Sequence, residues 1–168
     1  MMSIKIVEVK HTDDETIKAL ASLLINVVDD GASIGFLSPL SEKKAISYWR
    51  EAIEEHVKLW IATYNNVICG TIQLQLCTKE NGLHRAEVAK LIVHSEYRRL
   101  GIAKKLLESA EQGARINNRT LLVLDTREGD PSNMLYLKAG YIKAGKIPQF
   151  ALSSNGQLDA TVIYYKTI

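Results

Sequence analysis

The spacing of hydrophobic positions changes along the chain between the period of a strand and that of a helix. Residues 4–9 alternate apolar and polar side chains and predict a strand. Residues 12–15, Thr-Asp-Asp-Glu, match a capping box at the start of a helix. After a loop over residues 31–39, a second amphipathic helix is expected from about Ser41. The first helix has its apolar stripe at Ile17, Leu20, Leu23, Leu24, Val27 and Val28.

The middle of the chain is rich in strand-forming runs. Residues 59–63 and 67–76 predict two strands that meet at a tight turn over Asn65-Asn66. Residues 86–93 predict a third strand next to them. A polar turn over residues 79–82 precedes that strand, so this part of the chain is expected to form an antiparallel meander.

The remaining pattern predicts a crossover followed by closing strands. A helix from Gly101 to about Ile116 leads into a continuous apolar run, which is typical of a strand covered on both faces. The element order predicts a mixed α/β (α+β) fold, with a central, mostly antiparallel sheet flanked by helices and one β-α-β unit. The last predicted elements are a strand at 121–124, a helix at 132–139 ended by Gly140, and strands at 141–146 and 160–166.

Composition narrows the class of protein. The 168 residues are 46% hydrophobic and 24% charged, as expected of one globular domain over residues 1–168. A net charge of +2 is too small to predict binding to nucleic acid or to an anionic membrane. Cys69 and Cys77 form no C-x-x-C pair, so no metal site is predicted. Residues 1–6 lack the apolar stretch of a signal peptide, and we expect a cytoplasmic protein.

A basic turn lies between an apolar strand and an amphipathic helix. Its residues run Arg98-Arg99-Leu100-Gly101-Ile102-Ala103, followed by Lys104. Such a turn directs backbone N–H groups and a helix N-terminus at one point, where a pyrophosphate is stabilised. The arginines can bind phosphate oxygens, and Gly101 permits close approach of a ligand.

The turn Arg98-x-x-Gly101-x-Ala103, directly after a strand, resembles the acyl-coenzyme A motif of the GNAT N-acetyltransferase superfamily. The proline that usually precedes the motif is absent from His94-Ser95-Glu96-Tyr97. A second likeness is the run Leu-Tyr-Leu-Lys-Ala-Gly-Tyr at residues 135–141. From His84 onward the chain also resembles one group of this superfamily, the tabtoxin resistance acetyltransferases, which acetylate a β-lactam amino acid toxin.

The resemblance implies the GNAT fold and acetyl-CoA as the acetyl donor, with coenzyme A as its product. It implies that backbone groups of the strand at Leu91, Ile92 and Val93 pair with the pantetheine arm. Tyr136 would then be the general acid for the leaving thiolate; its alternative role is an ordinary core aromatic. The residues expected to hold the donor are Leu91, Ile92, Val93, Arg98, Arg99, Leu100, Gly101, Ile102, Ala103, Lys104 and Asn133.

Two carboxylates complete the candidate site. Glu87 lies on the strand before the basic turn, and Asp125 ends the following strand. If the two strands are neighbours, both carboxylates face one cleft, where they can bind a cationic amine and relay its proton. The alternative is that both are exposed acids at strand ends, with Asp125 capping a turn.

These residues together predict an N-acetyltransferase that transfers acetyl by direct attack of a primary amine. The acceptor is expected to be a small amino-acid-like, antibiotic or toxin molecule, and a homodimer is expected by analogy. One alternative is acetylation of a protein lysine or N-terminus. A second is a coenzyme A-binding regulatory module without turnover. Nucleic-acid binding is disfavoured because the basic residues gather at one turn.

Overall fold

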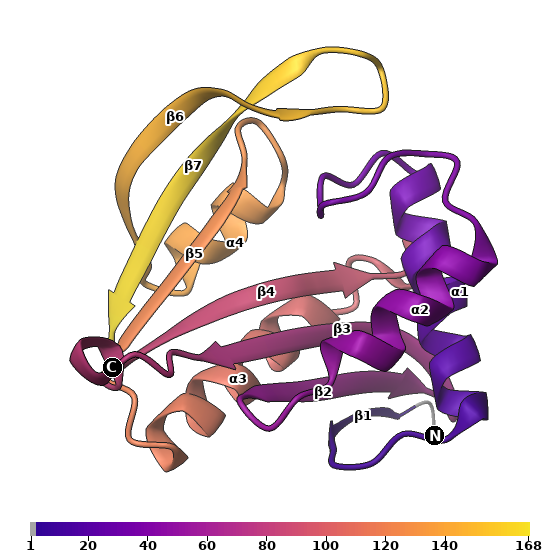
Figure 1. Ribbon diagram of the computed structural model, residues 1–168, viewed down its shortest axis with the longest axis horizontal. Helices are drawn as coiled ribbons and strands as arrows, with labels where there is room; N and C mark the ends of the chain where they lie inside the picture. The colour runs from indigo at the N-terminus through magenta and orange to yellow at the C-terminus, as the bar shows by residue number, and fades with distance from the viewer. Residues whose placement is uncertain (1–2) are drawn as a thin grey trace.

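A mixed sheet of seven strands forms the centre of residues 3–168, the part of the chain described by the computed structural model (Figure 1). Met1 and Met2, which belong to the N-terminal stretch used to predict location, lie outside the described residues. The strand order is β1-β2-β3-β4-β5-β7-β6. The strands are β1 (Ile4–Val9), β2 (Val57–Tyr64), β3 (Val67–Leu76), β4 (Arg85–Val93), β5 (Leu121–Arg127), β6 (Ile142–Leu152) and β7 (Leu158–Thr167).

Helices cover both faces of this sheet (Figure 1). One core cluster joins α1 and α2 to the face that presents Leu59 and Ile92. The other joins α3 and α4 to the face that presents Trp60 and Leu122. The helices are α1 (Asp14–Asp29), α2 (Glu42–Ala52), α3 (Ile102–Ile116) and α4 (Ser132–Lys138), with short 3₁₀ turns η1 (Glu80–Gly82) and η2 (Ser95–Tyr97).

The predicted architecture is confirmed at the level of elements and topology. β2 to β4 form the antiparallel meander, β1 pairs antiparallel with β2, and β4-α3-β5 is the parallel β-α-β unit. Asn65 and Asn66 have φ of 50° and 68°, the left-handed pair that a tight two-residue hairpin turn needs. Gly140, with φ of 86°, follows the C-cap of α4 as expected.

Two local predictions were wrong. The N-cap of α1 is Asp13, whose carboxylate accepts a hydrogen bond from Thr16 N at 2.7 Å, and not Thr12 of the predicted capping box. The closing strands are longer than expected, because β6 continues through residues 147–152 with a bulge between Ile147 and Ala151. The side chains of β6 are mostly exposed, so no alternation of buried positions indicated the extension.

Strands β4 and β5 separate soon after they begin. They pair only over Arg85–Glu87 and Leu121–Val123, and beyond this the two strands diverge (Figure 1). A bulge also interrupts β4, since Ala89 and Ile92 are three residues apart but pair with Gln73 and Thr71, which are two apart. Lys90, inside the bulge, has φ of 50°. The divergence opens the sheet at its centre, which is where the candidate site lies.

Candidate active site

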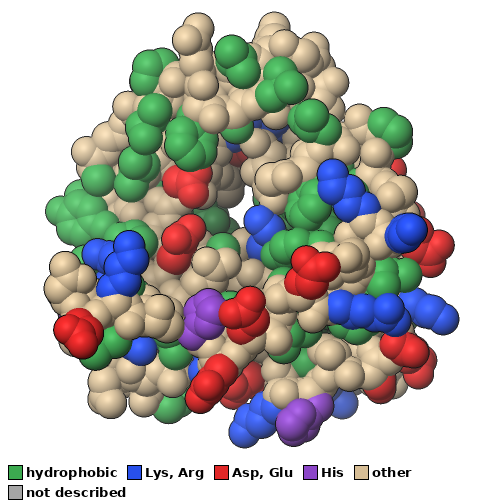
Figure 2. All heavy atoms as spheres, viewed as in Figure 1, with side chains coloured by type: hydrophobic (Ala, Val, Ile, Leu, Met, Phe, Trp, Pro, Cys, Tyr) green, Lys and Arg blue, Asp and Glu red, His purple; other side chains and the backbone are tan. Residues whose placement is uncertain are grey.

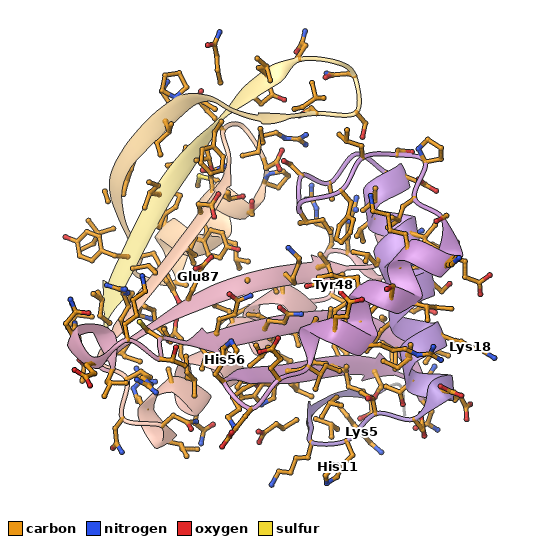
Figure 3. All side chains as sticks on the ribbon, viewed as in Figure 1. Lys5, His11, Lys18, Tyr48, His56 and Glu87 are labelled. Atoms are coloured by element: carbon orange, nitrogen blue, oxygen red, sulfur yellow. The ribbon has the colours of Figure 1, made fainter. Side chains whose placement is uncertain are left out.

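Glu87 and Asp125 lie on the same side of the opening between β4 and β5. On β4 the flanking residues Ala86 and Val88 enter the α3 core, and on β5 Leu124 does the same, so the two carboxylates point to the opposite face. Both line one cavity of about 240 Å³. Glu87 lies at the base of the opening, where β4 and β5 part (Figure 3). The structure thus brings together the two acids that the sequence singled out.

The electrostatics of the pair favour proton exchange at Glu87. Burial raises the pKa of Glu87, and the negative charge of Asp125 raises it further, while Lys90 and Arg85 oppose the rise. A carboxylate with a raised pKa is a stronger base than an ordinary one. Asp125 is held in place by Thr161, whose Oγ1 donates to Asp125 Oδ2 at 2.7 Å. One carboxylate is therefore fixed by a neighbour, and the other is poised to change its protonation.

Tyr136 lies on α4, on the opposite face of the sheet from the two acids. It is 6% exposed and packs against Tyr141 and Tyr164, with ring centroids 5.7 and 6.0 Å away. Burial, and then the charge of Asp125, raise its pKa well above the ordinary value of tyrosine. The phenol therefore keeps its proton at any working pH. Full transfer of that proton to a thiolate is uphill, which favours a hydrogen-bonding role toward the sulfur.

The basic turn is tied to α1. Asn26 Oδ1 accepts a hydrogen bond from Ser95 N at 3.1 Å, and Asp30 forms an ion pair with Arg98 whose Nη1–Oδ2 distance is 2.6 Å. These contacts were not predicted, because the partners are about 70 residues apart in sequence. Arg98 is thus already paired with Asp30, while Arg99 is exposed. Binding of a phosphate by these two arginines stays a prediction.

The start of α3 is free to receive an anion. Gly101 is its N-cap, with φ of 76°, and no side chain caps the helix. The N–H groups of the first turn, which begins at Ile102 and Ala103, have no acceptors within the helix. Ile102 is buried beneath this turn, Leu100 is largely exposed, and Lys104 pairs with Glu108 at 3.8 Å. These features fit the pyrophosphate of a coenzyme.

The β4 edge beyond Glu87 fits an extended ligand. Its backbone pairs with β3 on one side, while β5 has diverged on the other. The side chains of Leu91 and Val93 pack toward the α3 core, and Ile92 packs toward α1 and α2. Neighbouring residues of a strand direct their backbone N–H and C=O groups to opposite sides. The backbone groups of Ile92 face Thr71 on β3, so those of Leu91 and Val93 are the ones available to a ligand lying in the gap.

The side chain of Asn133 is held by hydrogen bonds within the fold. Its Nδ2 donates to the carbonyls of Arg127 and Asp130, both at 2.9 Å, and its Oδ1 accepts from Tyr164 Oη at 2.8 Å. The amide thus fixes the turn between β5 and α4. A donor contact through Asn133 stays a prediction, and it would have to compete with these three bonds.

Arg127 was missed by the sequence analysis. Its guanidinium donates to Asp130 Oδ1 at 3.0 Å, to Ser153 Oγ at 3.1 Å and to the carbonyl of Gly31 at 3.0 Å. It thereby links the end of β5 to the α1–α2 loop and to the β6–β7 turn. Ser38 N also donates to Ser154 Oγ across these two segments, at 3.1 Å. Together the contacts close one end of the cavity.

The cavity is lined by charges of both signs. The space-filling view shows a hollow at the centre of the molecule, with acidic side chains along one side and a basic group on the other (Figure 2). Glu87, Asp125 and Asp159 contribute acids, and Lys90 and Arg127 contribute cations. Within residues 3–168 no group of three or more potential metal ligands occurs, and no helix is long and apolar enough to cross a membrane.

A curated protein of known family is similar in sequence to part of this chain. The curated rat (Rattus norvegicus) N-acetyltransferase 8F1 is 31% identical over 96 residues, which are 56% of this chain and 43% of that protein. The chain thus matches less than half the length of this relative.

Solved structures are similar over nearly the whole chain. An acetyltransferase of the GNAT family from Streptococcus pneumoniae has a TM-score of 0.81 at 17% identity, covering 99% of this chain and 100% of that one. The yncA protein of Salmonella typhimurium, whose structure contains its cofactor acetyl-CoA, has a TM-score of 0.79 at 15% identity, covering 99% and 93%. The model of the acetyltransferase (GNAT) family matches residues 28–141. By this match the chain belongs to the GNAT acetyltransferase family.

Proposed function

We propose that the protein is an acetyl-CoA-dependent N-acetyltransferase whose acceptor is the primary amine of a small, amino-acid-like molecule. The observation that carries the proposal is the pair Glu87 and Asp125, which line one open cavity at the point where β4 leaves β5. An amine entering this cavity would meet two carboxylates. The opposite face of the opening holds Tyr136 and leads to the basic turn at α3.

The two acids suit the amine side of the reaction. Both carboxylates attract an ammonium ion, and Glu87, whose pKa is raised by burial and by the nearby Asp125 charge, accepts its proton directly or through water. The neutral amine then attacks the acetyl carbonyl directly, and the bond between the carbonyl carbon and sulfur breaks. The second proton that the nitrogen loses passes through water to the leaving sulfur, so coenzyme A leaves as a thiol. Thr161 keeps Asp125 oriented toward the cavity throughout.

The donor side rests on backbone groups and on Tyr136. When bound, acetyl-CoA supplies the activated acetyl group. Backbone groups of the Leu91–Val93 segment that face away from β3 orient the pantetheine arm, and the turn Arg98–Lys104 binds the pyrophosphate. Tyr136 Oη donates a hydrogen bond to the leaving sulfur, where negative charge develops. The acetyl-CoA contained in the yncA structure supports this choice of donor.

The shape of the cavity supports a small acceptor over a protein. About 240 Å³ corresponds to roughly eight water molecules, less than the usual volume of a drug-sized site. Arg127 and Ser38 hold the α1–α2 loop and the β6–β7 turn together at one end of the cavity. A protein chain would need these segments to separate.

An amine-panel assay tests the proposal. Release of free coenzyme A is followed with acetyl-CoA and a panel of amines that includes diamino acids and β-lactam amino acids, and mass spectrometry identifies each acetylated product. We expect turnover of small amino-acid-like amines and a higher melting temperature with acetyl-CoA. A mass shift on cellular proteins, without one on small amines, would favour protein acetylation. Tight coenzyme binding without any turnover would favour a regulatory module.

Four further expectations stay predictions. The resemblance to the tabtoxin resistance acetyltransferases predicts a β-lactam amino acid as the acceptor. The β-lactam amino acids in the amine panel test this prediction. A cytoplasmic location and a single domain over residues 1–168 stay expectations drawn from the sequence pattern. The expected homodimer finds support in exposed apolar side chains on the β6–β7 hairpin, namely Ile142, Ile147, Phe150, Leu152 and Leu158.

A further inference from the structure

Lys90 projects into the acceptor cavity from the bulge in β4. Its φ of 50° places it outside the regular strand, and its side chain lines the cavity with Glu87 and Asp125. Its Nζ lies 6.0 Å from the ring centroid of Phe36 and 5.7 Å from that of Tyr48. Figure 3 shows Tyr48 where α2 meets β4. Two aromatic rings therefore form the wall behind the ammonium group and hold it by cation–π attraction.

The charges of the cavity remain apart. Within residues 3–168, no carboxylate lies within 4.0 Å of Lys90 Nζ, and no hydrogen bond holds it. The acids still act on it at longer range, since Glu87 and Asp125 favour its charged form while burial disfavours that form. Unlike charges that face one another across a small cavity, without pairing, favour a ligand that carries the complementary charges.

Other charged groups of the cavity are already committed. Arg127 is bound by Asp130, Ser153 and the Gly31 carbonyl. Asp159 accepts a hydrogen bond from Ser153. Among the described lining residues, this leaves Lys90 as the cation available to an anionic ligand group, opposite Glu87 and Asp125.

We propose that Lys90 is a specificity-determining residue that binds a carboxylate of the acceptor, so that the acceptor is a zwitterionic amino acid. This inference rests on the proposed function and names its substrate class. The ammonium group that becomes acetylated faces Glu87 and Asp125, and the carboxylate pairs with Lys90. The apolar residues Ile34 and Phe150, which also line the cavity, contact the rest of the molecule.

Matched acceptors test this assignment. Each amino acid that is acetylated is compared with its carboxamide, which has the same amine and no carboxylate. For the unaltered protein we expect kcat/KM for the acid to exceed that for the amide by roughly 10- to 100-fold, as for a charge-assisted hydrogen bond. Lys90→Met should lose this preference, because its rate falls on the acid and not on the amide. Lys90→Arg should retain much of it.

Lys44 provides a matched control. Its Nζ lies 5.9 Å from the same Phe36 ring, but it is exposed on α2 and does not line the cavity. Lys44→Met should therefore leave the preference for the acid unchanged. Folding of each variant is checked by its melting temperature and by the rise that acetyl-CoA causes. Lys90→Gln serves as a second neutral variant if Lys90→Met does not fold; neither is β-branched, so both suit a positive φ as lysine does.

The outcomes separate the inference from the proposed function. Equal rates on acids and amides, with Lys90→Met behaving like Lys44→Met, would overturn the role of Lys90 and leave the acetyltransferase intact. Failure of the unaltered protein to acetylate any acid or amide would refute the proposed function, and the inference with it. Loss of the preference in Lys90→Met alone supports the inference.

Discussion

Gly113 is a glycine in the interior of a helix, where alanine is normally better by about 1 kcal/mol. In this protein we expect the opposite sign for Gly113→Ala. A Cβ at this position would lie 2.4 Å from Cη2 and 2.5 Å from Cζ2 of Trp60. Trp60 is on β2, 8% exposed, and belongs to the core beneath α3. The indole ring of Trp60 therefore occupies the space that a side chain at Gly113 would need.

The size of the effect follows from that overlap. Ordinary carbon–carbon contacts begin near 3.5 Å, so the ring or the helix must move by about 1 Å. Overpacking of this kind costs about 1–3 kcal/mol, and a shift of this size lies toward the upper end. Subtracting the gain in helix propensity leaves a loss of about 2 kcal/mol. The melting temperature should then fall by about 4–8 °C.

A double-mutant cycle isolates the contact. Trp60→Phe removes the two ring atoms that the new methyl group would meet, at its own cost in packing. Urea unfolding of the four proteins gives the free energy of unfolding of each. In the Trp60→Phe background, Gly113→Ala should be neutral or stabilising by up to about 1 kcal/mol. Equal effects of Gly113→Ala in both backgrounds would refute the steric argument.

Three further predictions concern the site. Tyr136→Phe should lower kcat by roughly 100-fold while the Kd for acetyl-CoA, measured by calorimetry, is unchanged; equal turnover would reject its role at the sulfur. Asp125→Asn should move the acidic limb of the kcat/KM pH profile to lower pH. Burial and the Asp125 charge both raise the pKa of Glu87, and this variant removes the charge but leaves the burial. A shift to higher pH would contradict the prediction. Arg127→Gln should raise the KM for the acceptor and lower the free energy of unfolding by about 1–3 kcal/mol, because it removes the contacts to Ser153 and Gly31. Arg127→Lys should have an intermediate effect. A change confined to acetyl-CoA binding would contradict the role of Arg127 at the acceptor cavity.

Strong periodicity explains why most elements could be predicted. The apolar stripe of α1 is buried where the pattern indicated. The run of β5 was expected to be covered on both faces, but only Leu122 and Leu124 are buried. Leu121 and Val123 are half-buried, because they lie on the same face as Asp125, which borders the cavity. The end of β6 gave no such signal, because its side chains are exposed on both faces. Thr and Asp are both preferred N-cap residues, so the sequence could not distinguish Thr12 from Asp13 as the N-cap of α1. The backbone geometry of the structure identifies Asp13.

The candidate site could be predicted in part. The neighbouring strands that bring Glu87 and Asp125 together followed from the β-α-β pattern. Contacts between residues far apart in the sequence could not be predicted from this pattern. An example is the hydrogen bond from Arg127 to Gly31, which are 96 residues apart. Lys90 also carried no local signal, since a lysine with a positive φ cannot be distinguished by composition from one in a regular strand.

The bulge at Lys90 links the two sides of the site. Without it, strand alternation would keep residues 86, 88, 90 and 92 on the α3 face; with it, Leu91 and Val93 face α3, while Ile92 faces α1 and α2. One extra residue thus reverses which side chains face α3 between Glu87, where we propose that the acceptor binds, and Leu91 to Val93, where we propose that the donor binds. The same residue presents an ammonium group to the acceptor cavity. We therefore expect a deletion that restores regular alternation to disturb donor binding and acceptor selection together, and Lys90→Met to change acceptor selection alone.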